Sequence, residues 1–493
     1  MRLDPLSVPY RAVSALTRLA WILVFATFGS QQAFGLEVAA GVLSVGLVGA
    51  LAYQFAYVRR FDYELTENTL DIESGVLSRR TREIPYNRVQ NVDLSQNPVQ
   101  RALGLTEVRV ETAGGGDTEA QLRFVSEAEA RRLQREIGRL KRGETATERD
   151  DETVDEFGEQ LYAISPTELA LLGVVQLDLR LLSFVAALVP LFVPSVSEMF
   201  PIYSLLTVAP FLLAGLVAVS LAVSSVRAIA NYYAFRLWRS EGELRYERGL
   251  FQRYNGTIPL DKVQSVAVTE SVVARWLGYA SLEVQTAGYA PGDQQGSQAA
   301  VPLAERGRVV SLAREVEPFG DLTFERPPTR ARQRYLVRYA IVVGLVVALA
   351  YGVAQVAPFE LPFPWFTVAL LWLVVPPAAH LKWRNLGVAL AENHVVTRAG
   401  FWTRSTKVVP YYRVQTLVQR ETLFQRRRHL ATLVVDTAGS SGLAGNDASA
   451  IDVDADRASE LRNLLDDRLQ DALTASRYAR RERRQRREAL AGN

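Results

Sequence analysis

The sequence predicts a multi-pass α-helical membrane protein with three cytoplasmic β-rich domains. Two kinds of sequence alternate along its 493 residues, namely paired apolar segments without charge and strongly charged polar blocks. A length of this order is enough for several domains. The third observation is a nine-residue phrase that occurs once in each polar block, as IPYNRVQNV at 84–92, IPLDKVQSV at 258–266 and VPYYRVQTL at 409–417.

The apolar segments predict three helical hairpins. A helix needs roughly 20 residues to cross a bilayer core that is about 30 Å thick. Residues 19–36 and 38–58 carry no charge and are separated only by Glu37. The same pairing recurs at about 181–200 with 203–230 and at about 337–357 with 362–381. We therefore expect six spans.

Arginine and lysine predict the orientation of these hairpins. The turns around Glu37, at 194–201 and at 357–364 contain acidic residues but neither Lys nor Arg. Basic residues lie instead near the other ends of the spans: Arg59, Arg60, Arg227, Arg236, Lys382 and Arg384. By the positive-inside rule, the protein is expected in the cell membrane with both termini and all polar blocks in the cytoplasm.

One stretch before the second hairpin predicts a helix of another kind. Ser165, Pro166 and Glu168 match an N-cap, an N1 proline and the acid of a capping box. Asp178 and Arg180 are too polar for the middle of a span. We expect an interfacial helix here, or a cytoplasmic extension of the third span.

The three polar blocks align without a gap for about forty residues when their prolines are placed in register. Each copy has a glycine ten residues before the proline, Val-Gln four and five residues after it, and Thr-Ala-Gly further on. The shared residues are Gly75, Pro85, Val89 and Gln90; Gly249, Pro259, Val263 and Gln264; and Gly400, Pro410, Val414 and Gln415. We interpret them as structural, with the valine inward and the glutamine amide bonded to a neighbouring backbone.

Each polar block predicts a small antiparallel sheet closed by one helix. Runs such as 62–67 and 107–112 alternate with period two and are rich in Val, Thr and Tyr, which is typical of strands. Residues 126–140 begin with a Ser126/Glu129 capping box and place apolar residues on one helical face.

These residues resemble the bacterial PH-like domain membrane proteins of the triple-repeat YdbT-like type. The resemblance covers residues 1–470 and rests on the spacing of glycine, proline, Val-Gln, Leu-Gly and Thr-Ala-Gly in three copies. It implies PH-like domains, in which two bent antiparallel sheets are capped by a C-terminal helix, and it implies little about activity. The third copy has Arg428-His429 where the others have Leu-Gly, so the sequence does not predict whether this copy forms the same tight turn.

The predicted organisation alternates membrane hairpins and PH-like domains. Its segments are 1–60 (hairpin 1), 61–142 (PH-like domain 1), 143–165 (acidic linker), 166–232 (interfacial helix and hairpin 2), 233–317 (PH-like domain 2), 318–335 (linker), 336–383 (hairpin 3), 384–470 (PH-like domain 3) and 471–493 (basic tail).

Three further positions are basic in every copy. Counted from the proline, they are −6 (Arg79, Arg253, Arg404), +3 (Arg88, Lys262, Arg413) and +16 (Arg101, Arg275, Arg426). They could form a cationic face that contacts anionic lipid headgroups or a protein partner. They could equally be solvated strand charges, and this second interpretation is favoured at +16, which precedes a predicted turn.

Residues for catalysis are not apparent, and we expect a protein that is not an enzyme and needs no cofactor or metal. The chain has no Cys, and its three His residues show no metal-ligand spacing. The basic run at 477–488 lacks interleaved aromatic residues beyond Tyr478, which favours lipid or solvent over nucleic acid.

The sequence therefore predicts an integral membrane scaffold whose PH-like domains bind anionic lipid or protein partners at the inner membrane surface. Self-association through sheet edges is a further possibility. The alternative is a component of a membrane transport or export system, although spans without ionisable residues at mid-depth argue against it.

Overall fold

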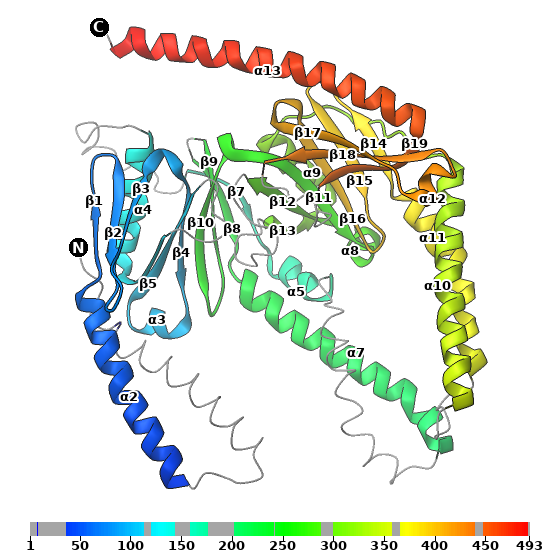
Figure 1. Cartoon of the computed structure of the whole chain (residues 1–493), viewed down its shortest axis with the longest axis horizontal. Coiled ribbons are helices and arrows are strands. Elements are labelled where there is room, and N and C mark those ends of the chain that lie inside the picture. Colours follow the sequence, from blue (N-terminus) through cyan, green and yellow to red (C-terminus); the bar gives the residue numbers. More distant parts are fainter. Residues whose placement is uncertain are drawn as a thin grey trace. The chain divides into compact units, whose positions relative to one another are not determined.

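A computed structural model describes Ser7 and residues 36–112, 120–142, 158–175, 202–240, 242–286, 299–356, 365–438 and 447–491. The chain divides into two compact units, which are described separately. Unit 1 contains residues 1–160 and 234–261, and unit 2 contains residues 161–233 and 262–493. Figure 1 shows that antiparallel strands and long helices make up both units.

Module 1 lies within unit 1 and follows the apolar helix α2 (Leu36–Arg59). Its first sheet has the order β1-β2-β3, and its second half begins with the 3-10 turn η1 and ends with a helix. The elements are β1 (Asp62–Leu65), β2 (Thr69–Ser74), β3 (Arg80–Pro85), η1 (Tyr86–Arg88), β4 (Val89–Gln96), α3 (Pro98–Ala102), β5 (Leu105–Thr112), β6 (Ala120–Ser126) and α4 (Glu127–Arg142).

Modules 2 and 3 repeat this order of elements. Module 2 comprises β8 (Arg236–Ser240), β9 (Glu243–Arg248), β10 (Arg253–Pro259), η2 (Leu260–Lys262), β11 (Val263–Ser271), α8 (Val272–Leu277), β12 (Tyr279–Thr286), β13 (Ala299–Glu305) and α9 (Arg306–Val316). Module 3 comprises β14 (Gly387–Leu390), β15 (His394–Ala399), β16 (Thr403–Pro410), η4 (Tyr411–Arg413), β17 (Val414–Arg420), α12 (Leu423–Arg426), β18 (Leu430–Thr437), β19 (Ala448–Asp454) and α13 (Ala455–Ala491).

The core of module 1 is formed by the inner faces of the strands and one face of α4. Leu70, Leu122, Leu133 and Ile137 are each fully buried. Burial of a side chain of this size contributes about 1.5–3 kcal/mol. The Glu129 amide donates to the Ser126 hydroxyl at 3.3 Å, which confirms the predicted start of this helix.

The repeated phrase forms the corner at which the chain passes from the first sheet to the second. In all three copies the residue after the proline donates its amide to a carbonyl eighteen residues earlier, at 2.9–3.1 Å: Tyr86 to Asn68, Leu260 to Gly242, and Tyr411 to Asn393. The valine that opens the next strand is 1, 2 and 7% exposed in the three copies. The prediction of an inward valine is therefore confirmed.

The repeated glycine forms the turn between the second and third strands of each module. Gly75, Gly249 and Gly400 have φ values of +115°, +109° and +121°. A Cβ atom there would lie 1.8–1.9 Å from the carbonyl oxygen of the residue three positions later. Only glycine fits such a turn without displacing the backbone.

The third copy keeps the later turn although it lacks the Leu-Gly pair. His429 takes φ +50°, where Gly104 and Gly278 take +66° and +80°. Its carbonyl accepts from the Ala455 amide at 3.1 Å, as the Gly104 and Gly278 carbonyls accept from Glu127 and Arg306. Histidine is among the residues that adopt this left-handed conformation more readily than most.

Strands of successive modules pair with one another. In unit 1, β10 of module 2 pairs antiparallel with β4 of module 1, so the sheet has the order β6-β5-β4-β10-β9-β8-β7, where β7 is Glu159–Ala163. In unit 2, β16 of module 3 pairs antiparallel with β11 of module 2, in a sheet of order β13-β12-β11-β16-β15-β14. The first three strands of module 2 (β8, β9 and β10) thus lie in one sheet with strands of module 1, and its last three (β11, β12 and β13) lie in one sheet with strands of module 3.

Both pairings use the same register. Arg253 lies opposite Gln96, and Arg404 lies opposite Glu270. In each case position −6 of one copy faces position +11 of the preceding copy. The repeat therefore includes the contacts between modules as well as the modules themselves.

The remaining helices are α5 (Pro166–Val175), α7 (Ile202–Tyr232), α10 (Thr329–Val356), α11 (Val375–Arg384) and the 3-10 segment η3 (Trp365–Val374). The Ser165 amide donates to the Glu168 carboxylate at 2.8 Å and the Glu168 amide donates to the Ser165 hydroxyl at 3.2 Å, so the predicted capping box of α5 is confirmed. Strand β7 occupies part of the predicted acidic linker, and α10 begins within the predicted linker 318–335.

The predicted class of a multi-pass α-helical membrane protein with six spans is wrong. Within the described residues two helices are long and apolar enough to cross a membrane, Thr329–Val356 and Trp365–Arg384, and antiparallel sheets dominate the described chain. The proposed spans at 19–36 and 181–200 lie outside the described residues, save for Leu36. An apolar run reports length and composition, which do not by themselves establish that a helix crosses a bilayer.

Candidate functional site

The repeated turn lies at the end of the module where the preceding helix arrives. In module 1 the start of β1 faces the end of β2, with Asp62 opposite Glu73, and the Arg60 guanidinium donates to the Val76 carbonyl at 2.9 Å. In module 3 the Asn385 amide donates to the Phe401 carbonyl at 3.4 Å, directly after α11. The ring of Tyr339 in α10 lies 6.3 Å from the ring of Phe401.

This arrangement separates two of the predicted basic positions. Position −6 follows the turn directly, so Arg79, Arg253 and Arg404 lie at the helix end of each module. Position +3 lies in the 3-10 turn at the other end of the third strand. Six strand residues span about 20 Å. A membrane surface at the helix end of a module would therefore contact the residue at position −6 but not the residue at position +3, which is Arg88, Lys262 or Arg413.

The strand pairing brings position +16 close to the turn of the next module. Arg101 in α3 donates to the Leu250 carbonyl at 3.4 Å. In unit 2, Ser271 lies opposite Thr403, so α8 with Arg275 begins beside the turn of module 3. Arg101 is exposed, so its interpretation as a solvated charge stays a prediction. Arg426 in α12 is exposed, and among the described residues no strand of a further module pairs beside it.

Four arginines of unit 2 interact with the Glu270 carboxylate, and Arg326 interacts with one of them, Arg398. We call these five the arginine cluster: Arg275, Arg306, Arg326, Arg398 and Arg404. Arg404 donates to one oxygen of Glu270 through Nε at 3.0 Å and Nη2 at 2.8 Å. Arg306 Nε lies 3.1 Å from the other oxygen. The Glu270 side chain is only 2% exposed, so this carboxylate anchors the centre of the cluster.

The cluster contains more positive charge than its carboxylate neutralises. Burial lowers the pKa of Arg275, and the charge of Arg404 lowers it further. Burial also lowers the pKa of Arg398, and the charges of Arg404, Arg326 and Arg306 act in the same direction. In the described part of the chain, Glu270 is the one acid that forms an ion pair with the cluster. Such crowding of like charge favours an anionic ligand.

Exposed aromatic side chains border the arginine cluster. Trp276, next to Arg275, is 85% exposed, and Trp402, two residues before Arg404, is 48% exposed. The corresponding turn residues Leu77 and Phe251 are 94% and 58% exposed. Sequence reasoning missed these residues, although both positions after the repeated glycine are apolar in every copy. Tryptophan beside cationic side chains is typical of membrane–water interfaces.

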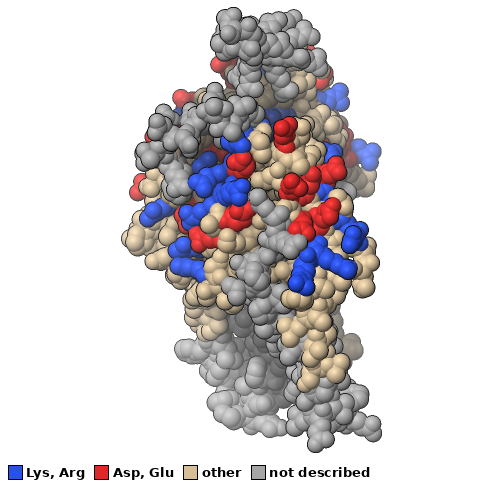
Figure 2. Space-filling view, turned by 90° about the vertical axis from the view of Figure 1, so that its left-hand side faces the viewer, with Lys and Arg blue, Asp and Glu red and all other residues tan. Residues whose placement is uncertain are grey.

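Basic and acidic side chains are interspersed on one side of module 1. Figure 2 shows the side of the molecule at which this module lies, where Lys and Arg side chains alternate with Asp and Glu side chains. Arg131 pairs with Glu127 at 2.7 Å, for example, and Arg109 pairs with Glu107 at 2.9 Å. The arginine cluster of unit 2 differs from this mixture, because one acid forms ion pairs with it among the described residues.

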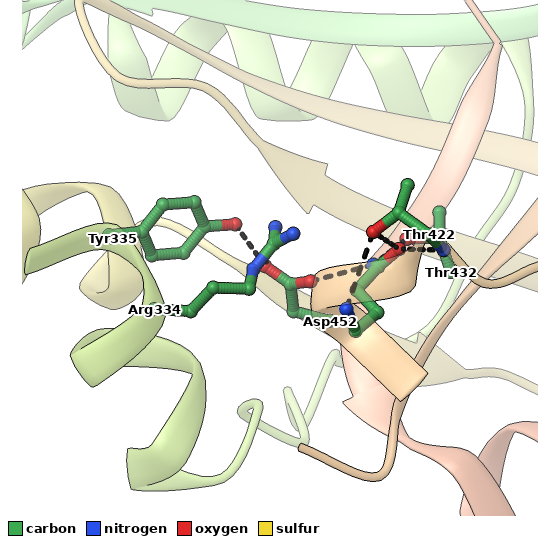
Figure 3. Close-up of polar contacts among 6 residues, drawn as sticks. Arg334, Tyr335, Thr422, Thr432 and Asp452 are labelled. Carbon is green, nitrogen blue, oxygen red and sulfur yellow. Dashed lines mark hydrogen bonds and ion pairs between the residues drawn. The ribbon is translucent and has the colours of Figure 1, made fainter. Parts of the chain in front are cut away.

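A buried polar cluster joins helix α10 to module 3 (Figure 3). Asp452 in β19 is fully buried and accepts from Arg334 Nη2 at 2.7 Å. The Tyr335 hydroxyl donates to the same carboxylate oxygen. Gln425 Nε2 in α12 donates to the second oxygen at 2.7 Å and to the Thr432 hydroxyl at 2.8 Å. The carboxylate therefore fixes the start of the helix to two elements of the module.

Module 2 is fixed to its helices by apolar contacts instead. Leu303 lies at the position of β13 that corresponds to Asp452, and it packs with Leu172 of α5 and Ala228 of α7. The Tyr162 hydroxyl donates to the Leu303 carbonyl at 2.6 Å. Sequence reasoning missed both contacts, because Asp452 and Leu303 differ in chemistry and neither belongs to the aligned phrase.

These features define a membrane-associated protein built from repeated PH-like modules. The chain belongs to the family described as Bacterial PH domain, which matches it at residues 15–141, 180–318 and 340–469. It is similar to the UPF0699 transmembrane protein YdbT of Bacillus subtilis (strain 168), with 25% identity over 435 residues, which cover 82% of this chain and 84% of that protein. The predicted family is confirmed.

A second relative matches a shorter part of the chain. The UPF0699 transmembrane protein YdbS of the same organism is 36% identical over 107 residues, which cover 21% of this chain and 65% of that protein. No solved structure matches the chain. The YdbT-like relationship identifies the chain as a membrane protein, and the two relatives' names state no ligand.

Replacement of Asp452 by Asn is expected to destabilise module 3 strongly. The variant removes the fully buried carboxylate charge that pairs with the half-buried Arg334 guanidinium, and breaking such a pair costs about 3 kcal/mol or more. Asp454→Asn is the matched control, because the Arg330–Asp454 pair is partly exposed and contributes about 0–1 kcal/mol. Urea unfolding of the full chain in detergent measures both. Equal effects of the two variants would contradict the assigned role of Asp452.

Proposed function

We propose that this protein is a membrane scaffold whose PH-like modules bind anionic lipid at the inner membrane surface. The observation that carries the proposal is the arginine cluster, which lies beside two exposed tryptophans and next to the turn that contacts Tyr339 and Asn385 of the helix pair α10/α11. As the sequence predicts, the proposed role is binding rather than catalysis.

The position of the cluster supports lipid as the ligand. Helices α10 and η3/α11 are the two candidate spans among the described residues, and the turn of module 3 contacts Tyr339 in α10 and Asn385 directly after α11. A ligand bound between Trp402 and Arg404 would therefore lie at the level of lipid headgroups. Trp402 itself would extend into the interface, where indole rings are favoured.

The chemistry of the cluster supports phosphate as the group recognised. Arginine presents a planar set of donors that matches phosphate oxygens, and charge-assisted bonds of this kind are among the strongest hydrogen bonds in proteins. Nη1 of Arg275 is buried and has no hydrogen-bond partner among the described residues. Each basic side chain near an acidic membrane surface contributes about 1 kcal/mol.

The charge distribution around the helix pair supports a cytoplasmic location of the modules. Arg330, Arg332, Arg334 and Arg338 lie in the first turns of α10, and α11 ends with Lys382 and Arg384. The intervening segment 357–364 contains neither Lys nor Arg. By the positive-inside rule the module end of this pair faces the cytoplasm.

Replacement of two cluster arginines is expected to weaken binding of anionic lipid. The purified full chain in detergent is titrated with dioctanoyl phosphatidylglycerol, dioctanoyl phosphatidylcholine or inorganic phosphate, and thermophoresis measures the binding. We expect preference for the anionic lipid over phosphatidylcholine, and an affinity about tenfold lower or worse in Arg275→Gln/Arg398→Gln. The loss of two crowded charges should leave the melting temperature unchanged or raise it.

The control is Arg101→Gln/Arg253→Gln in unit 1, in which Arg101 and Arg253 occupy the positions of Arg275 and Arg404, and Gln96 stands in the place of the central glutamate. This control should bind within about twofold of the wild type, since each of its arginines lies outside the cluster. Equal binding of both lipids, or equal binding by the cluster variant, would contradict the proposal. Binding of inorganic phosphate with the affinity of the lipid would identify a free anion as the ligand. Failure of all three probes would direct the search to protein partners.

The sidedness of the modules is tested with single cysteines, because the natural chain has none. Val356→Cys at the end of α10 should react with an impermeant maleimide added to intact cells. Tyr412→Cys in η4 should react only after the membrane is permeabilised. The opposite pattern would place the modules outside the cytoplasm.

A further inference from the structure

Two sheet edges are unpaired in the described part of the chain. Each internal junction joins the third strand of one module to the fourth strand of the preceding module, as β10 joins β4 and β16 joins β11. In the described part of the chain, the third strand of module 1, β3, pairs with no strand of another module, and neither does the fourth strand of module 3, β17. The sheets β1-β2-β3 and β17-β18-β19 accordingly end at these strands.

The burial of equivalent residues shows that these two edges differ from the paired ones. Ala267 in β11 is 5% exposed, whereas the corresponding Val418 in β17 is 40% exposed. Gln264 is buried at 5%, whereas the corresponding Gln415 is exposed. The residues 80–83 of β3 are all exposed, whereas the corresponding residues of β10 and β16 are buried or half-buried. An uncovered strand edge is a template for a further strand.

We infer that β17 of one copy pairs antiparallel with β3 of a second copy of this chain, in the register already used twice within the chain. That register places position −6 opposite position +11. Applied to the free edges, it places Arg79 opposite Glu421 and Arg80 opposite Arg420. The inference does not depend on lipid binding, since it uses neither the arginine cluster nor the membrane helices.

Charge complementarity supports a second copy as the partner. At the junction of modules 2 and 3 these positions hold Arg404 and Glu270, which form a two-bond ion pair at 2.8 and 3.0 Å. The free edges hold the same two residue types, Arg79 and Glu421, and both are exposed. The contact between copies would therefore reproduce the strongest polar contact between modules.

Exposed apolar side chains lie at the same place. Within the chain, the turn before the third strand lies beside the short helix of the preceding module, as the contact of Arg101 with Leu250 shows. Leu77 in the free turn of module 1 is 94% exposed, and Leu423 and Phe424 in the free helix α12 are 55% and 64% exposed. The proposed register brings these side chains together and removes apolar surface from water.

One pair in this register is unfavourable. Arg80 and Arg420 would lie directly opposite each other, where the internal junction has Ser405 opposite Thr269. Like charges opposite each other weaken a strand pair. The repulsion between Arg80 and Arg420 weakens the association, which is therefore reversible. Because the joined surfaces differ, the association is head-to-tail and leads to a closed ring or an extended array.

Cysteine crosslinking tests the register. Full chains carrying Arg80→Cys or Arg420→Cys and different tags are co-expressed, and membranes are oxidised with copper phenanthroline. Opposite residues of an antiparallel pair have Cα atoms roughly 4.5–5.5 Å apart, within the range that a disulfide requires. We expect a crosslinked dimer that contains both tags, and little of either homodimer. Arg82→Cys with Arg420→Cys, two residues out of register, should crosslink at least about fivefold less.

Charge reversal then separates the proposed contact from a chance encounter. Arg79→Glu in the Arg80→Cys chain should lower the yield about tenfold, and Glu421→Arg in the partner chain should restore it. A folded, monodisperse pair of variants without a mixed crosslink would overturn the inference. A chain that carries both cysteines and crosslinks only within itself would overturn it as well, since the two edges would then meet inside one copy.

Discussion

The antiparallel pairing between the third strand of one module and the fourth strand of the module before it is the constraint on which the other features depend. It occurs in both units with the same offset from the repeated proline. In unit 2 this offset brings Arg404 to Glu270 and starts α8 beside the turn of module 3. Without the pairing, Arg275 of module 2 would not lie near Arg404 of module 3, and the arginine cluster would not form.

The sequence was sufficient to predict the content of each module and the reason for its repeated residues. Gly249 has a backbone conformation that excludes a side chain, Val263 is buried at the start of a strand, and Gln264 donates to the Lys262 carbonyl at 3.2 Å. The capping box of α5 also forms, and Ser126 accepts from the Glu129 amide at the start of α4, as the spacing predicts. These features were predictable because each involves residues that are close in the chain.

The contacts between modules and with the helices could not be predicted, because they join residues far apart in the chain. A strand has two edges, and alternation of residues does not reveal which edge meets a neighbour or remains open. Asp452 was overlooked because its partner Arg334 lies 118 residues away and its module differs here from module 2. The prediction of six spans was wrong for a related reason, since it rested on apolar length; two of the expected spans, 337–357 and 362–381, coincide with helices that are long and apolar enough to cross a membrane.

The arginine cluster carries excess positive charge and lies beside the turn that contacts the helix pair α10/α11. The most direct test uses spin labels at residue 402 or residue 412 of the full chain, each introduced by one cysteine and reconstituted in anionic vesicles. Oxygen and a water-soluble nickel complex report the surroundings of each label. The account predicts that the label at Trp402 is shielded from nickel and accessible to oxygen, whereas the label at Tyr412, at the far end of the same strand, is accessible to nickel. Equal accessibility of both labels to nickel would show that the arginine cluster does not face the membrane.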